Sequence, residues 1–250
     1  MLNSVIHGED TAAPPLMIAH GLYGSARNWG VIAKRLADSR RVVSVDMRNH
    51  GESPMTDTHS YADMAADLGE VIGEGPWDIV GHSMGGKAAM VLALTQPDKL
   101  RKLVVADIAP VGYGHTQVQY IEAMRAVDLA QVETRGDADR QLAPHVPEDG
   151  SRAFLLQSLD VKGRRWRLNL DVLEREMPGI IGFPEVDGQF DGPALFLSGG
   201  DSDYVRPEHR DRIRALFPRA RFAKIPGAGH WLHAEKPREF EAAIRVFLDA

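Results

Sequence analysis

The sequence predicts an α/β protein in which helices cover both faces of a mostly parallel sheet of about seven strands. The first observation is that short runs rich in Val, Ile and Leu alternate along the chain with segments of helical periodicity, the order typical of parallel sheets. The second is that these runs show no polar alternation, as expected of strands buried on both faces. The length of 250 residues suits one large domain, or one domain that carries an insertion.

The first half of the chain supplies most of the predicted elements. Strands are expected near residues 2–6 and over residues 16–20, 41–45, 78–81 and 102–106. One helix is expected to begin at Asn28, a residue type that caps helices, and another at Ser60, where Asp63 resembles the second half of a capping box. A third, Ala-rich helix is expected over residues 84–96. Each of these helices lies between two predicted strands, which is the arrangement of repeated βα units.

The alternation breaks after Pro110 and later resumes. Residues 111–188 have a mainly helical pattern. The elements expected after them are strands over residues 193–197 and 221–225, a helix that Pro207 can open and a last helix that begins at Pro237. We therefore predict a core formed by residues 1–110 and 189–250, with residues 111–188 inserted over the edge of its sheet.

Composition excludes several classes of function. The 29 Lys and Arg residues are outnumbered by 35 Asp and Glu residues, so no general affinity for nucleic acid or for an anionic membrane is expected. The absence of Cys excludes disulfides, thiolate metal sites and a Cys nucleophile. The first residues lack a signal-peptide pattern, and no apolar run approaches 18 residues. We expect a cytoplasmic protein with no membrane partner.

The segment Gly81-His-Ser-Met-Gly85 fits the pattern G-x-S-x-G between a predicted strand and a predicted helix. The glycines allow a sharp turn that exposes Ser83 next to a helix N-terminus, whose free N–H groups favour developing negative charge. A Gly-Ser turn without chemistry would give the same five residues. The strand before it and the helix after it favour a nucleophile.

Two further loops complete a candidate site. The loop His20-Gly-Leu-Tyr-Gly24 follows a predicted strand, and the backbone N–H groups of Leu22 and Met84 are candidates for an oxyanion hole. His230 follows the last strand and precedes the last helix, a position that places an imidazole over the nucleophile in Ser–acid–His order. His233 is a less favoured alternative. Candidate substrate-binding residues are Tyr23, His82 and Trp231.

Four motifs together resemble the α/β-hydrolase superfamily: H-G-x-x-G, D-x-R-x-H-G-x-S, G-H-S-M-G-G and G-A-G-H, in this order and spacing. The stretches at residues 46–51, 107–111, 166–169 and 229–237 resemble the YbfF-type bacterial esterases within it. The resemblance covers essentially the whole chain and implies that residues 111–188 form a small helical cap. It also implies carboxylesterase activity and hydrolysis of acyl-CoA thioesters.

The acid partner of His230 has three candidates. Many relatives carry it in a pattern G-x-x-D-x-x-V, but here the stretch Gly199–Val205 places Ser202 in that slot, flanked by Asp201 and Asp203. Asp107 instead ends the strand after the nucleophile helix, where the YbfF-type subgroup carries its acid. We favour Asp107, with Asp201 and Asp203 as alternatives.

The predicted function is a serine hydrolase that cleaves small-molecule esters or thioesters through an acyl-enzyme, without metal or cofactor. A perhydrolase (haloperoxidase-like) would use the same triad without a cofactor, and a ligand receptor could keep the scaffold without turnover. Haloalkane dehalogenase and epoxide hydrolase activities are set aside, because both need a carboxylate at the position of Ser83. The basic run Lys162–Arg167 offers Arg164 and Arg165 to the phosphates of a CoA leaving group, or is a solvated or paired surface.

Overall fold

The computed structural model describes residues 1–250 and contains a seven-stranded sheet in the order β1-β3-β2-β4-β5-β8-β9. Only the pair β1 and β3 is antiparallel. The predicted α/β class and the number of strands are confirmed. The strands are β1 Ser4–His7, β2 Leu16–Ala19, β3 Val42–Val45, β4 Trp77–His82, β5 Leu100–Ala106, β8 Ala194–Gly199 and β9 Ala220–Ile225.

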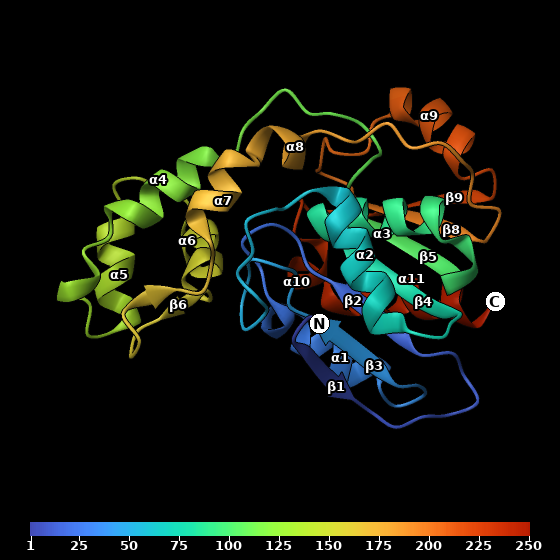
Figure 1. Cartoon of the computed structure of the whole chain (residues 1–250), viewed down its shortest axis with the longest axis horizontal. Helices are drawn as coiled ribbons and strands as arrows, with labels where there is room; N and C mark the ends of the chain where they lie inside the picture. The colour runs from blue at the N-terminus through green and yellow to red at the C-terminus, as the bar shows by residue number, and fades with distance from the viewer.

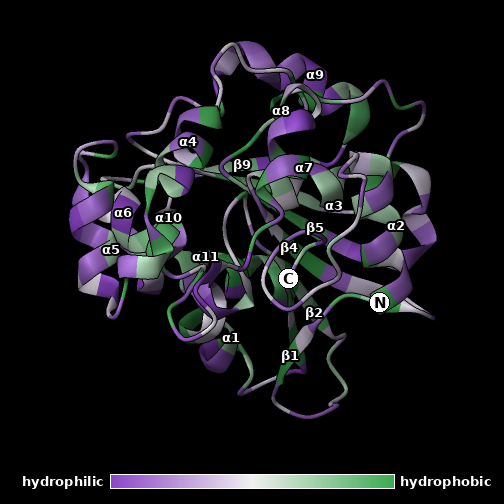
Figure 2. Cartoon of the chain, turned by 60° about the vertical axis from the view of Figure 1, so that its left-hand side comes forward, coloured by the Kyte–Doolittle hydropathy of each residue, from purple (hydrophilic) through white to green (hydrophobic).

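Helices cover both faces of this sheet. On one face lie α2 (Tyr61–Ile72) and α3 (Met84–Thr95), and on the other lie α1 (Gly30–Leu36) and α11 (Pro237–Asp249). Met17 of β2 packs in the first core cluster and its neighbour Leu16 in the second, so both faces of the strand are apolar. Figure 2 shows the apolar residues gathered on the central strands and the polar ones on the outer sides of the helices.

A local sequence signal explains where α2 begins, but one such signal misplaced the first helix. Ser60 Oγ accepts the N–H of Asp63 at 3.1 Å and caps α2, as predicted. The prediction that Asn28 starts the first helix was wrong. Asn28 Oδ1 accepts the backbone N–H of Ser25 at 2.6 Å, which closes a 3₁₀ turn at Ala26–Trp29, and α1 starts only after this turn.

Between β5 and β8 the chain forms five short helices and a two-stranded hairpin, which lie beside the core in Figure 1. The helices are α4 Val118–Ala126, α5 Arg135–Leu142, α6 Asp149–Leu156, α7 Leu170–Arg175 and α8 Met177–Ile181, and the hairpin strands are β6 Leu159–Asp160 and β7 Arg165–Trp166. A core loop holds this segment at Tyr23, whose hydroxyl donates to the carbonyl of Gln117 at 2.8 Å. The Tyr23 carbonyl in turn accepts the hydroxyl of Ser158 at 2.8 Å.

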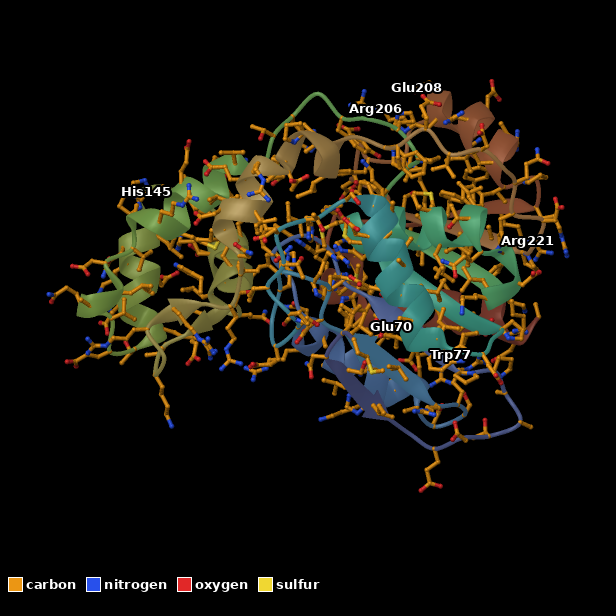
Figure 3. All side chains as sticks on the ribbon, in the orientation of Figure 1. Glu70, Trp77, His145, Arg206, Glu208 and Arg221 are labelled. Carbon is orange, nitrogen blue, oxygen red and sulfur yellow. The ribbon has the colours of Figure 1, made fainter.

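The remaining elements are short. Two 3₁₀ turns, Pro97–Lys99 and Leu129–Gln131, precede β8, and the 3₁₀ turn Pro207–His209, α9 Arg210–Leu216 and α10 Leu232–Glu235 follow it. The edge strand β9 carries exposed Arg221 and Lys224, and Arg221 projects outward from it in Figure 3. Charges on an edge strand oppose pairing with another sheet. None of the helices combines the length and apolarity that crossing a membrane requires.

Candidate active site

Ser83 lies on a sharp turn between β4 and α3. Its φ of 51° and ψ of −119° belong to a region that non-glycine residues rarely adopt. A Cβ atom on Gly81 would collide with the carbonyl oxygen of Gly85, and one on Gly85 would collide with that of Ala19. The two glycines are therefore required for α3 to start directly after Ser83, which leaves the first N–H groups of the helix beside its side chain.

His230 is bound to Asp107, which directly follows β5. His230 Nδ1 lies 2.8 Å from Asp107 Oδ2, and because a carboxylate only accepts, Nδ1 is the protonated nitrogen. Nε2 is then the nitrogen that is free to accept a proton. His230 forms no hydrogen bond with Ser83 in this structure, as is common in free enzymes, but both residues line the same cavity.

The Asp107 carboxylate is fully buried and accepts two more hydrogen bonds. Oδ1 accepts the backbone N–H of Gly199 at 3.0 Å, and Oδ2 accepts the hydroxyl of Ser202. Ser202, the residue in the slot where many relatives carry the acid, is thus a hydrogen-bond partner of Asp107. Asp201 and Asp203 are exposed and neither is bound to His230.

The other sequence-predicted positions divide into two groups. Leu22, Met84, Tyr23, His82 and Trp231 line the cavity with Ser83. Ala19 of β2 is paired in register with Gly81 of β4, so Leu22 and Met84 both lie just beyond the ends of neighbouring strands. Arg164 and Arg165 belong to the hairpin and are not part of the cavity wall. Their proposed contact with CoA phosphates stays a prediction.

Several buried histidines in or beside the cavity wall already form hydrogen bonds inside the protein. His82 Nε2 lies 2.8 Å from the carbonyl oxygen of His230, and burial holds the pKa of His82 well below its ordinary value. His20 and His50 accept the backbone N–H groups of Met47 at 2.9 Å and Tyr23 at 3.1 Å. Burial lowers the pKa of both imidazoles. These histidines therefore order the loops around Ser83.

The cavity measures about 1050 Å³ with its open mouth included, and about half of its lining residues are hydrophobic. Sequence reasoning missed most of the lining residues, among them Tyr204, Tyr113 and Lys87. The ring of Tyr204 stacks on that of His230 at 4.0 Å between centroids. A lysine within the apolar helix predicted over residues 84–96 was the one signal that could have drawn attention to Lys87. An apolar cavity that opens at a serine and an imidazole suits an acyl chain.

A serine on a sharp strand-to-helix turn, with an imidazole and a carboxylate from other strand ends at the same edge of a mostly parallel sheet, is the arrangement of the α/β hydrolases. The chain belongs to the alpha/beta hydrolase fold family, whose sequence profile matches residues 14–237. The predicted resemblance is thereby confirmed.

Three relatives place the chain within the family. It is 45% identical over 252 residues to the mouse sn-1-specific diacylglycerol lipase ABHD11, covering 96% of this chain and 82% of that protein. It is 42% identical over 241 residues to the esterase YbfF of Escherichia coli, covering 94% and 93%. A solved structure described as a marine microorganism esterase superposes with a TM-score of 0.93 at 40% identity, covering 98% of each chain.

Proposed function

We propose that the protein is a carboxylester hydrolase that works through an acyl-enzyme on Ser83. The observation that carries the proposal is the hydrogen bond between His230 and the buried Asp107. His230 lines the same largely apolar cavity as Ser83, which is held in a strained turn. The names of the relatives, an esterase and a lipase among them, support an ester as substrate.

In this mechanism His230 Nε2 accepts the proton of Ser83 as its oxygen attacks the acyl carbonyl. Asp107 keeps the imidazole in the required tautomer and stabilises the imidazolium. The N–H groups of Leu22 and Met84 donate to the oxyanion. His230 then protonates the leaving alcohol, and a water molecule activated by the same imidazole releases the acid.

Thioesters are a second substrate class for the same chemistry. The attacked carbonyl and the acyl pocket are shared, and only the leaving group at the mouth differs. Comparing kcat/KM across a panel of p-nitrophenyl esters and acyl-CoAs of graded chain length decides between esters and thioesters as the preferred substrates.

Ser83→Ala tests the mechanism. Because Ser83 is a small side chain at the cavity surface, the variant should fold, and kcat should fall by about 10⁶ if the nucleophile is lost. A fluorophosphonate probe should label Ser83 in the parent and nothing in the variant. Activity above a few per cent in a pure variant would contradict the acyl-enzyme. Peroxide-dependent bromination by the parent would instead indicate a perhydrolase. Tight ligand binding without turnover would indicate a receptor.

A further inference from the structure

Lys87 is a buried lysine in the helix that follows the nucleophile. Its exposed fraction is 1%, and every residue of α3 from Met84 to Leu94 is buried. Lysine is almost never buried so completely without a partner of opposite charge, because removing an ammonium from water is costly. Lys87 nevertheless lines the same cavity as Ser83 and His230.

The partners of Lys87 are all uncharged. Its Nζ donates to the carbonyl oxygens of Ile181, at 3.0 Å, and of Gly182, at the end of α8. It also lies 4.8 Å from the ring centroid of Tyr113 and 5.7 Å from that of Tyr61. No carboxylate is paired with it. A neutral amide could bond the same carbonyls, so the helix end alone does not account for a charge at this place.

The surroundings of Lys87 contain no group that fixes its charge, so a bound anion would favour the protonated form. Burial lowers its pKa to about 7. The titratable groups that face it are Tyr61 from α2 and Tyr113 from the segment after β5, and burial raises the pKa of both hydroxyls. Asp107, beyond Tyr113, has its oxygens bound by His230, Gly199 and Ser202. The ammonium has no counter-charge of its own.

We propose that Lys87 determines acyl specificity by binding a carboxylate at the far end of a short acyl chain. The preferred substrates are then half-esters of short dicarboxylic acids, and this inference rests on the proposed ester hydrolysis. Ser83 and Lys87 are one helical turn apart, a rise of about 6 Å. The side chains of Met84, Ile108 and Ile180 line the same cavity and would contact the intervening methylene groups.

The experiment measures kcat/KM for the monoethyl esters of succinate, glutarate and adipate. Each is compared with a neutral ethyl ester in which an isopropyl group replaces the carboxylate. For at least one length the parent should favour the half-ester by about 10- to 100-fold, the range expected of a hydrogen bond between charged groups. Lys87→Gln and Lys87→Met should abolish this preference. The ratio is the readout because a disturbed α8 end lowers the active fraction equally for both substrates.

Lys102 offers a matched control. It is also buried, and its Nζ donates to the carbonyls of Phe247 and Leu248 at 3.0 Å, but it is not part of the cavity wall. Lys102→Gln removes the same kind of helix-end contact but leaves the cavity unchanged. It should therefore keep the parent's ratio of kcat/KM for half-ester and neutral ester. Loss of the preference in Lys102→Gln as well would show that it reflects general stability, and would overturn the proposal.

The pH dependence of the ratio is a second readout. In the parent, the preference for the half-ester should decline as the pH rises above 7 and Lys87 loses its proton, and it should be flat in Lys87→Gln. Any pH dependence of the hydrolytic steps themselves cancels in the ratio, because both substrates go through the same steps. Two results would overturn the role of Lys87 but leave the proposed function standing. One is hydrolysis of the neutral ester with no preference for any half-ester, and the other is a preference that survives in Lys87→Gln. Hydrolysis of neither substrate overturns the proposed function together with it.

Discussion

The substitution Asp107→Asn tests the proposed acid, because it keeps the shape of the side chain and removes its charge. The amide oxygen can replace only one of the two carboxylate oxygens. If it faces the N–H of Gly199, the amide group donates to His230 Nδ1 and Ser202 Oγ, so that every polar group is satisfied. If it faces His230, the amide N–H₂ meets the buried N–H of Gly199, which costs about 1–3 kcal/mol.

The first orientation therefore dominates and selects the wrong tautomer. With Nδ1 as acceptor, His230 carries its proton on Nε2 and cannot accept one from Ser83. The lost attraction to the imidazolium is itself worth about 4 kcal/mol at 4 Å with an effective dielectric constant of 20, or about 10³ in rate. The same change in a model protease costs about 10⁴ in kcat. We expect a loss of at least about 10² here.

The assay is kcat on one p-nitrophenyl ester, with circular dichroism to confirm folding. Asp201→Asn and Asp203→Asn are the controls, because both side chains are exposed and unattached to His230. Each should stay within about tenfold of the parent, since neither touches the proposed triad. An active Asp107→Asn enzyme alongside a collapsed Asp201→Asn or Asp203→Asn enzyme would refute the reasoning and place the acid after β8.

Three further predictions concern the surroundings of the site. Ser202→Ala removes a hydrogen bond to Asp107 and should lower kcat by about 3- to 10-fold, less than the full value of a bond to a charged group, because Asp107 keeps its bonds to Gly199 and His230, whereas Ser202→Thr should retain kcat. Burial lowers the pKa of His233 to about 3, so the unfolded chain binds the extra proton and unfolding free energy should fall by up to about 1.4 kcal/mol per pH unit below 6.5. His233→Phe keeps an aromatic ring on Trp29 and should reduce this slope in urea titrations between pH 6.5 and 4. Reversal of Arg164 and Arg165 to Glu should raise KM for acyl-CoA but not for small neutral esters, and equal losses on both would indicate a misfolded insertion.

The strands of the sheet could be predicted because the sequence signals that identify them lie within each segment. Strands covered on both faces must be apolar throughout, and the turns between strands and helices need glycine at defined places, such as Gly81 and Gly85. The start of the first helix was predicted wrongly because Ser25 and Asn28 are both residue types that cap helices. The hydrogen bond between them makes Ser25 the cap of the 3₁₀ turn, and the sequence alone does not show that bond. The hairpin at residues 159–166 has strands of two residues each, too short for any periodicity.

The site was predictable only where one segment builds it. Ser83 is set by its own turn, and His230 by the loop that follows the last strand. The acid was ambiguous because Asp107, Asp201 and Asp203 all follow strands whose carboxyl ends lie at one sheet edge, and the sequence does not show which side chain turns toward the imidazole. Which of these aspartates contacts His230 depends on the order β5-β8-β9 in the sheet, a long-range relation that no local pattern encodes.

Backbone strain is concentrated at that same sheet edge. Of the five non-glycine residues with positive φ, four follow the carboxyl ends of β2, β3, β4 and β5: Tyr23, Asn49, Ser83 and Asp107. Such conformations cost about 1–3 kcal/mol each and persist only where the surrounding structure enforces them. Here the enforcement comes from strands buried on both faces and from the histidines that bind the loops. The core thus holds Ser83 and Asp107 in conformations that the isolated loops would abandon, and substitutions in β4 or β5 should disturb kcat before they unfold the chain.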